Sequence, residues 1–334
     1  MNPQDLTYPV PIIPHEVWSV SDSSKLTLFM DCPRRFFFRH VLGWEYDYPN
    51  IHLDFGSTWH IAMEYLLEHL RTDGYSAEVL LEAYRLLEEK YRESFDESMD
   101  QDNGAKTPAN ALIALTEYAK KYVLDRDKYN VLYTEVVGTV PLSEHHLIHF
   151  KIDAILEGLM GILCREHKTS GQDSEVYQKS HQLSIQTGTY THALYCAFPS
   201  KHIYGVEINL AILRKKGNEF RRIPVIRSEE GMASWLYTTI YWMNMVDYHF
   251  RLLSESSADD YVLRAFPQNP QACTKFNTLC PYHAFCSAWA NPLKNAESPP
   301  IGFKVDFWDP RSIDLKAKFK MSESGEIKEI KHES

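Results

Sequence analysis

The sequence predicts an α/β or α+β fold in which a helical lobe is inserted beside a small mixed sheet. Three observations predict it. Helical spacing of apolar residues dominates from about residue 60 to 130, β-branched runs begin at about residue 131, and a further helix follows near residues 181–198. Elements in this order are typical of a mixed sheet with helices packed on it. A chain of 334 residues, 44% of them apolar, is long enough to bury such a core.

The first part of the chain is expected to be an arm followed by helices. Residues 1–18 contain four prolines, so an extended arm is predicted over 1–20. A helix is expected to begin near Ser21 to Ser24, where Ser and Asp side chains can cap it. Helical patterns recur from His60 to about residue 130, and one of these helices opens with Pro108 in a favourable first-turn position.

Strands and a helix are predicted next, in a core over about residues 131–215. The strand-like runs cover 131–142, 145–156, 159–170 and 202–213, with a turn at Glu157–Gly161 and the helix near 181–198 after the third run. A short strand near 221–227 and a long aromatic helix over 229–253 follow. A segment that contains three cysteines occupies about 265–290, and 291–334 is expected to be a charged tail.

Composition limits the classes of function. The formal net charge of −10 argues against a protein coated with Lys and Arg for indiscriminate nucleic-acid binding, although a basic groove beside an acidic site is compatible with it. No apolar run is long enough to span a bilayer, and the N-terminus lacks the pattern of a secretory signal. A cytoplasmic, reducing location without a membrane partner is therefore expected, in which cysteines are free or bound to metal.

An acidic pair and a lysine are the central candidate site. Asp153 stands near the end of one predicted strand, and Glu166 and Lys168 stand in the next. In a hairpin the strand ends are neighbours, and Glu166 and Lys168 share a face because side chains alternate along a strand. Converging carboxylates are costly unless a cation neutralises them, and Mg²⁺ prefers such oxygen ligands. A lysine beside that metal suits the hydrolysis of a phosphodiester.

The alternative interpretation is an ordinary surface. Asp and Glu-x-Lys are common on exposed strand faces, so this short motif is weak by itself. Asp153 and Glu166, however, both follow apolar stretches that predict buried strands. Ionisable groups at the ends of buried strands favour a functional site.

Four short motifs follow one another along the chain: Gly56-Ser57-Thr58-Trp59-His60, Lys151-Ile152-Asp153, Glu166-His167-Lys168-Thr169, and Gln186 to Tyr190. With them the chain resembles, over about residues 21–290, the RecB-like branch of the PD-(D/E)XK nucleases, which contains RecB and AddB nuclease domains and CRISPR-associated exonucleases. In the order of that family they correspond to GxxxH, G-x-[IV]-D, [DE]-x-K-T and Q-x3-Y. Each motif is short, and their order makes them specific together.

The resemblance implies a restriction-endonuclease-like core, a small mixed sheet flanked by helices, and a bound Mg²⁺ or Mn²⁺. By that resemblance His60, Asp153 and Glu166 are metal ligands, and the backbone carbonyl of His167 is a further one. Lys168 would serve the attacking water or the transition state. The competing interpretation of His60 is a satisfied, partly buried imidazole, which is the commoner fate of a single histidine.

Gln186 and Tyr190 are one helical turn apart and therefore share a face. The resemblance places them near the site, where they contact the DNA backbone or orient the lysine. Alternatively, Tyr190 is a core residue and Gln186 lies on the helix surface.

Four of the six cysteines are candidate ligands of a second metal site. Cys273, Cys280 and Cys286 lie within fourteen residues, Cys32 stands far before them, and Cys164 and Cys196 lie in apolar patterns typical of structural thiols. The C-x6-C-x5-C spacing differs from the C-x2-C of zinc knuckles and leaves zinc and iron–sulfur open.

Relatives of the AddB and CRISPR-associated type place one cysteine before the first motif and three after the last, and these bind a four-iron, four-sulfur cluster. The resemblance thus implies a 4Fe-4S cluster on Cys32, Cys273, Cys280 and Cys286, with zinc as the alternative. Such a cluster would staple the C-terminal segment to the N-terminal one. It could place residues 34–39 along a DNA path, with arginines on phosphates and Phe or Trp44 stacking on bases. The alternative for 34–39 is a solvated amphipathic helix.

The expected function is that of a metal-dependent DNA nuclease, either an exonuclease or an endonuclease that trims ends or flaps, with a preference for single-stranded DNA. Recombination, repair or genome processing in a bacterium or virus is the expected setting. No G-x4-G-K-[ST] motif occurs in the chain, so it has no helicase of its own, and a helicase, recombinase or integrase is a possible partner. The alternatives are a non-catalytic iron–sulfur or zinc DNA-binding scaffold and a redox protein, which would leave the acidic strands without a role.

Overall fold

The computed structural model describes residues 2–275 and 278–330, and the chain divides into two units. Unit 1 consists of Met1–Tyr48, Thr139–Phe150 and Ala233–Ser312, and unit 2 of Pro49–Gly138, Lys151–Met232 and Ile313–Ser334. Each unit therefore combines segments that lie far apart in the sequence.

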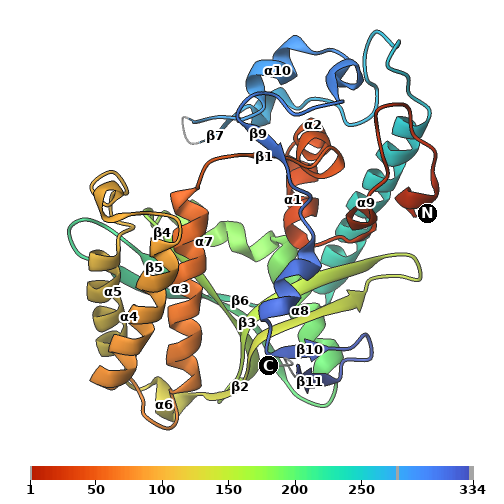
Figure 1. The fold of residues 1–334 in the computed structure, drawn as a ribbon. Helices are drawn as coiled ribbons and strands as arrows, with labels where there is room; N and C mark the ends of the chain where they lie inside the picture. Colours follow the sequence, from red (N-terminus) through yellow and green to blue (C-terminus); the bar gives the residue numbers. More distant parts are fainter. Residues whose placement is uncertain (1, 276–277, 331–334) are drawn as a thin grey trace. The chain divides into compact units, whose positions relative to one another are not determined.

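The helical lobe of unit 2 begins earlier than predicted. Its first helix, α3, starts at Ile51 because the Asn50 side chain accepts a hydrogen bond from the backbone N–H of His52 and caps it. Ser76 and Thr107 cap the next two helices in the same way. The lobe consists of α3 (Ile51–Glu68), α4 (Ala77–Arg92), the short η4 (Glu97–Met99), α5 (Pro108–Lys121) and α6 (Asp125–Lys128), and Figure 1 shows α3, α4 and α5 side by side.

A seven-stranded mixed sheet follows, which confirms the expected small mixed sheet flanked by helices. Neighbouring strands pair in the order β11-β10-β2-β3-β4-β5-β6; β4 runs parallel to β5, and β10 runs parallel to β2. The strands are β2 (Asn130–Pro141), β3 (Leu147–Gly158), β4 (Gly161–Ser170), β5 (Ile203–Ile212), β6 (Glu219–Val225), β10 (Phe319–Met321) and β11 (Ile327–Glu329).

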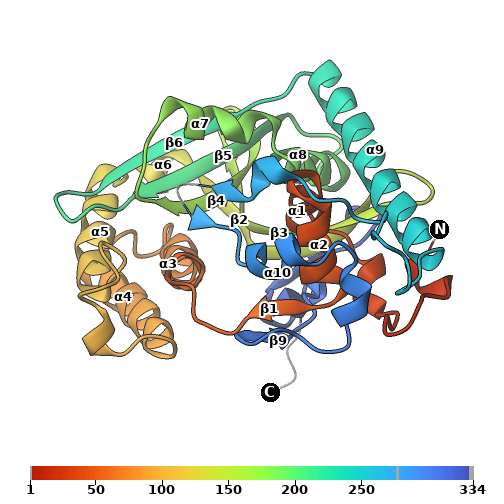
Figure 2. The ribbon, with the colours of Figure 1, turned by 90° about the horizontal axis from the view of Figure 1, so that it is seen from above.

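Helices cover both faces of this sheet. On one face, Ala211 and Phe220 pack with α3, α4 and α5 in one apolar cluster. On the other face lies α8 (Ile185–Ala197), preceded by α7 (Glu175–Ser180) and η5 (His181–Leu183); Figure 2 shows α7 and α8 beside the strands. Gln186 of α8 donates a hydrogen bond to Glu166 of β4. Side chains alternate along β4, so Glu166 and Lys168 point to the face covered by α8, and His167 points to the opposite face.

Unit 1 is built around an aromatic core. Phe29, Phe36, Phe37, Phe38 and Trp44 are all buried in it. The elements are η1 (Pro3–Asp5), η2 (Glu16–Ser19), α1 (Ser23–Asp31), α2 (Pro33–Phe36), the π-helical turn η3 (Phe37–Val41), β1 (Trp44–Tyr46), most of α9 (Glu229–Ser254), η6 (Pro270–Ala272), β7 (Thr274–Lys275), β8 (Thr278–Leu279), α10 (His283–Ala288), η7 (Pro292–Asn295), β9 (Phe303–Val305) and the start of η8 (Pro310–Lys316).

The proposed stacking of Phe36–Phe38 and Trp44 on bases is wrong. Phe37 and Phe38 are 0% exposed and Trp44 is 1% exposed, so these rings meet other side chains. Arg34 is buried as well, and its guanidinium donates to the backbone carbonyls of Phe266 and Leu263 at 2.8 and 3.1 Å. The segment is not a solvated helix face, because its aromatic rings complete the core; that the half-buried Arg35 and Arg39 contact phosphates stays a prediction.

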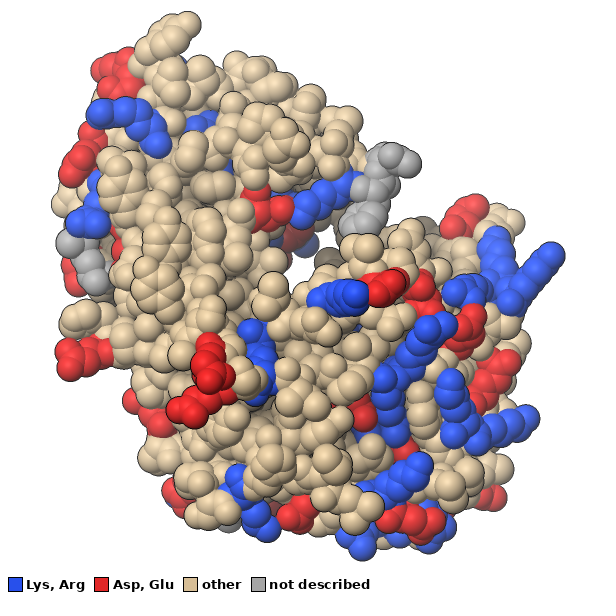
Figure 3. All heavy atoms as spheres, turned by 180° about the vertical axis from the view of Figure 1, so that it is seen from behind, with Lys and Arg blue, Asp and Glu red and all other residues tan. Residues whose placement is uncertain are grey.

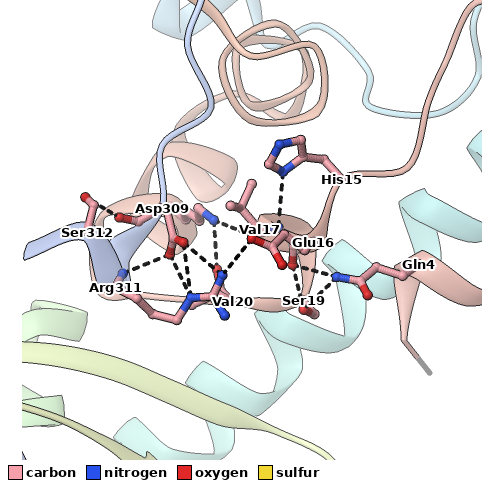
Figure 4. Close-up of polar contacts among 10 residues, drawn as sticks. Gln4, His15, Glu16, Val17, Ser19, Val20, Asp309, Arg311 and Ser312 are labelled. Carbon is pink, nitrogen blue, oxygen red and sulfur yellow. Dashed lines mark hydrogen bonds and ion pairs between the residues drawn. The ribbon is translucent and has the colours of Figure 1, made fainter. Parts of the chain in front are cut away.

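The N-terminal arm is folded onto unit 1 and is not simply extended. Val17 and Trp18 are buried, and the Lys25 ammonium donates to the carbonyls of Val17 and Val20 at 2.7 and 2.8 Å. Polar contacts add to this, since Gln4 donates to the carbonyl of Glu16, and Arg311 lies 3.5 Å from the Glu16 carboxylate (Figure 4).

The C-terminal segment also differs from the expected charged tail. β9 pairs with β1 in unit 1, and the β10–β11 hairpin extends the main sheet in unit 2. Short strands of high charge carry little apolar signal, so their pairing could not be anticipated from the sequence. No helix among the described residues is long and apolar enough to cross a membrane.

Candidate active site

The candidate site lies where β3 and β4 separate. Their antiparallel pairing runs from Gly158 and Gly161 to Ala154 and Arg165. Asp153 is the next residue on β3, and Glu166 the next on β4, so the two carboxylates come together at the fork. The hairpin turn predicted at Glu157–Gly161 is confirmed, and it sets this register.

Asp153 is held between helix and strand. Its Oδ1 lies 3.0 Å from Nδ1 of His60 on α3, and its Oδ2 accepts a hydrogen bond of 2.8 Å from the backbone N–H of His167. Burial by itself would raise the pKa of Asp153, but the neighbouring His60 and the His167 N–H hold it well below its usual value. Conversely, burial would lower the pKa of His60, and Asp153 raises it. Asp153 is therefore ionised at neutral pH.

Glu166 behaves differently from Asp153. Burial and the charge of Asp153 raise its pKa to about 7, against the opposing effect of Lys168. Its Oε1 accepts from Lys168 Nζ at 2.5 Å and from Gln186 Nε2 at 3.0 Å. Burial would lower the pKa of Lys168, but Glu166 raises it, so the side chain is an ammonium ion at neutral pH.

Gln186 and Tyr190 form one hydrogen-bonded chain with the site. Gln186 Nε2 also lies 2.9 Å from the Tyr190 hydroxyl, which donates to the backbone carbonyl of Lys151 at 2.6 Å. Tyr190 is 4% exposed, so it is both a core residue and a neighbour of the site. Through Gln186 and Tyr190, α8 thus links Glu166 on β4 to the backbone of Lys151 on β3.

A divalent cation would fit this group. Glu166 Oε2 is buried, and no hydrogen-bond partner among the described residues reaches it. Within residues 2–275 and 278–330, no set of three or more His, Cys, Asp or Glu side chains is arranged to hold a metal. Mg²⁺, however, needs only one or two carboxylates and completes its shell with water and substrate oxygens. The free oxygen of Glu166 beside ionised Asp153 meets that lower requirement.

His167 has another set of contacts. Burial lowers its pKa to about 3, so the ring is neutral, and Nδ1 lies 2.9 Å from the Asn209 amide on β5. Its N–H positions Asp153, as described above. A role of its carbonyl as a metal ligand stays a prediction.

A second charged group lies beside the site, and the sequence analysis missed it. Glu135 on β2 is buried and forms an ion pair with Lys151, and Lys318, just before β10, pairs with Glu64 and Glu68 of α3. Burial and the charge of Asp153 raise the pKa of Glu135 to about 7. Glu135 also has a φ of 50°, a strained value for a residue other than glycine. A glutamate within the apolar run 131–142 was the only signal available.

The four predicted cluster ligands line one cavity, but no three or more of the Cys, His, Asp and Glu side chains among the described residues are arranged to hold a metal there, so the cluster stays a prediction. Cys32, Cys273, Cys280 and Cys286 line one cavity of about 110 Å³ in unit 1, together with Arg35, Phe38, Tyr282 and His283. The backbone N–H of Cys280 donates to the carbonyl of Cys273 at 2.8 Å, next to the antiparallel pair of β7 and β8. Cys164 is buried and Cys196 half-buried, away from this cavity.

The chain matches one family model and, over a short stretch, one curated protein. A family model described as the PD-(D/E)XK nuclease superfamily matches residues 19–287, most of the chain. A stretch of 103 residues is 31% identical to peramine synthetase A of Epichloe festucae (strain Fl1). That match covers 29% of this chain and 4% of the fungal protein, so the chain spans only a small part of that protein's length.

Two solved structures show a limited likeness. A protein from Eubacterium rectale, provisionally described as an exonuclease, aligns with a TM-score of 0.43 and 13% identity over 71% of this chain and 82% of its own. SSO0001 aligns with a TM-score of 0.24 and 14% identity over 57% and 89%. At these TM-scores the likenesses carry no argument about activity.

Proposed function

Because this chain belongs to the PD-(D/E)XK nuclease superfamily, we propose that it is a divalent-metal-dependent deoxyribonuclease with Asp153, Glu166 and Lys168 at its centre. The observation that supports this most directly is the fork of β3 and β4. There two buried carboxylates converge beside an ammonium ion, and one oxygen of Glu166 has no hydrogen-bond partner in the part of the chain that the structure describes.

In this proposal Asp153 and Glu166 hold Mg²⁺ or Mn²⁺, with His60 and the His167 carbonyl as further ligands. The cation, when bound, supplies a water of lowered pKa and charge that offsets the phosphate. His60 also keeps Asp153 ionised, and the His167 N–H orients the Asp153 carboxylate toward the fork. Both carboxylates are thus pre-positioned before the substrate arrives.

Lys168 acts as a fixed positive charge. Because Glu166 raises its pKa, the amine is protonated at neutral pH and stabilises the charge that develops on the phosphate. Gln186 donates to the same Glu166 oxygen and keeps that carboxylate, and with it the ammonium group, in position. Tyr190 in turn holds Gln186 through its hydroxyl.

The proposed substrate is DNA, preferentially single-stranded or with free ends, and the proposed role is exonuclease or end-trimming action in recombination, repair or processing. A chain without a P-loop motif accepts opened DNA or works with a helicase, recombinase or integrase. The proposal extends to a 4Fe-4S cluster on the four cysteines of unit 1, with zinc as the alternative. Their common cavity supports this part.

The test is cleavage of end-labelled single-stranded DNA with Mn²⁺ or Mg²⁺. Lys168→Ala is expected to lower the rate by at least about a hundredfold, the scale of losing one transition-state charge contact. Lys201→Ala is the matched control, because Lys201 is an exposed lysine of the same unit that pairs with Glu157. Circular dichroism of both variants reports on folding.

The outcome also decides between enzyme and scaffold. Metal-dependent degradation by the wild type that is lost in Lys168→Ala supports the nuclease. DNA binding without turnover, in wild-type protein that carries iron or zinc, would instead favour a non-catalytic scaffold.

A further inference from the structure

A basic hairpin joins β5 and β6 in unit 2. Residues 213–222, Leu-Arg-Lys-Lys-Gly-Asn-Glu-Phe-Arg-Arg, contain five basic side chains and one acidic one, in a chain whose net charge is −10. Lys215 and Lys216 at its tip are exposed. In Figure 3, Lys and Arg side chains gather on the right of the view, where Figure 1 seen from behind has α5 and this hairpin.

The hairpin continues the strands that carry the site. Lys168 on β4 pairs in register with Leu210 on β5, which pairs with Arg221 on β6. Directly paired residues point to the same face, so Arg221 lies on the face of Lys168, two strand spacings or roughly 10 Å away. Arg221 also pairs with Asp173, whose side chain is 4% exposed, just after β4.

The end of α5 adjoins the hairpin from the other face of the sheet, the face of Phe220, which is opposite to Arg221 and Lys168. Phe220 packs edge-on against Tyr118 of α5, and Lys121 donates to the Phe220 carbonyl at 2.6 Å. The adjacent Lys120 is exposed. Asn218 bonds to Asn110 and to Glu117 of α5, so the hairpin base is fixed to the helix.

Three lysines of the hairpin tip and the end of α5 have no counter-charge within the described residues 2–275 and 278–330. Glu219 pairs with Arg214 and Arg221, and Asp125 pairs with Arg222, which accounts for the arginines. Lys120, Lys215 and Lys216 form no ion pair within the described residues; we name these three the basic hairpin patch. A merely solvated loop is the alternative, but solubility is already served by the negative net charge.

We propose that the basic hairpin patch binds the phosphate backbone of the DNA strand that is cut at Glu166 and Lys168. The inference rests on the proposed nuclease function and specifies its substrate path. Lys215 lies five residues beyond Leu210, which is one strand spacing from Lys168, so the backbones of Lys168 and Lys215 are at most roughly 22 Å apart, about six nucleotide steps of about 3.4 Å. The patch therefore contacts phosphates several nucleotides from the scissile bond, through charge and without reading bases.

The test measures binding separately from cleavage. Fluorescence anisotropy with a labelled single strand of about 30 nucleotides is recorded in EDTA, which blocks turnover, at several salt concentrations. Lys215→Ala/Lys216→Ala is expected to weaken binding at least about tenfold. The slope of log K against log salt should fall by about 1.4, since each lost single-strand phosphate contact lowers it by about 0.7.

The matched control is Lys201→Ala/Lys328→Ala, which removes two exposed lysines that pair with Glu157 and Glu326. Equal slopes for the two double variants would overturn the inference. Lys215→Arg/Lys216→Arg should bind like the wild type, because it keeps both charges. Stronger dependence on the patch for duplex DNA or RNA than for the single strand would overturn the assignment to a DNA strand.

Cleavage assays then distinguish the two proposals. With Mn²⁺, the alanine double variant should lose at least tenfold more kcat/KM on the long strand than on a dinucleotide that is too short to reach the patch. Equal losses on both substrates would contradict the inference. If no substrate is cut by the wild type, the nuclease proposal fails, while the binding result in EDTA still decides whether the patch contacts nucleic acid.

Discussion

Glu166 and Asp153 are chemically alike but electrostatically different in this protein. Asp153 has His60 and a backbone N–H beside it, so its pKa is low, whereas burial leaves Glu166 with a pKa of about 7. A carboxylic acid must lose its proton before it can hold a cation. Cation binding should therefore depend on pH through Glu166 and through the proposed ligand His60, and not through Asp153.

We expect Mn²⁺ affinity to rise at least about tenfold per pH unit below pH 7, because Glu166 is protonated below its pKa of about 7, and because His60, whose pKa Asp153 raises, must be neutral to act as a ligand. Titration calorimetry with Mn²⁺ between pH 5.5 and 8.5 checks this. Glu157→Gln, at a half-buried position of β3 away from the fork, is the control and should keep the same profile. A flat profile across this range would show that Glu166 does not take part.

Tyr190 is the second residue whose role can be isolated. We expect Tyr190→Phe to lower the free energy of unfolding by about 1–2 kcal/mol, because the Lys151 carbonyl and Gln186 lose their partner. Cleavage should slow about tenfold as Glu166 loses its support. Denaturant unfolding and single-turnover cleavage measure the two effects. Tyr195→Phe, an exposed tyrosine of the same helix, should change neither, and an equal loss in both variants would refute the role.

At the scale of elements, the short strand β10 is the least anticipated feature. It extends the sheet beside β2, and Lys318 just before it pairs with Glu64 and Glu68 of α3. α3 also carries His60, one turn before Glu64. The C-terminal segment thus stabilises the helix that presents a candidate metal ligand.

Lys318→Ala is expected to lower the free energy of unfolding by about 0.5–1 kcal/mol, a small value because the side chain is 43% exposed. Without this lysine, Glu64 and Glu68 repel each other, which should also weaken Mn²⁺ binding. Denaturant unfolding and Mn²⁺ titration test the two effects. Lys320 lies in β10 at an exposed position, so Lys320→Ala should change neither the free energy of unfolding nor Mn²⁺ binding. An equal loss of stability or of Mn²⁺ affinity in Lys320→Ala would point to a general charge effect.

At the scale of the whole molecule, the four clustered cysteines connect segments at opposite ends of unit 1. Thiolate ligands that close so long a loop should contribute much of the stability of that unit. A single substitution to serine, such as Cys32→Ser, Cys273→Ser, Cys280→Ser or Cys286→Ser, is expected to remove the bound metal. It should also lower the unfolding temperature by several degrees. Anaerobic purification with an absorption spectrum and iron and zinc analysis measures this. Cys196→Ser should retain the metal, since Cys196 lies outside the cavity.

The iron and zinc content of the purified protein distinguishes the two kinds of metal site. About four irons per chain and a brown protein support the cluster. Stoichiometric zinc in a colourless protein would replace it by the alternative, and absence of both metals from anaerobically purified protein would refute a metal role for these thiols.

Much of the core could be predicted from the sequence. The change from helical to strand period near residue 131 and the turn at Glu157–Gly161 were correct, because both depend on neighbours along the chain. The proximity of Asp153 to Glu166 follows from a hairpin alone. The pairing of Glu135 with Lys151, in contrast, could not be predicted, since a glutamate in an apolar strand does not reveal its partner.

Local residue order and residue type thus determined the strands of the fork and the chemistry that meets there. Only the tertiary structure decided which basic and aromatic side chains face solvent. Arg34 and Trp44 are buried, while Lys215 and Lys216 are exposed. The physical reason is that burial depends on partners far along the chain: the acceptors of Arg34 lie more than 220 residues away, at Leu263 and Phe266. No local pattern contains that information.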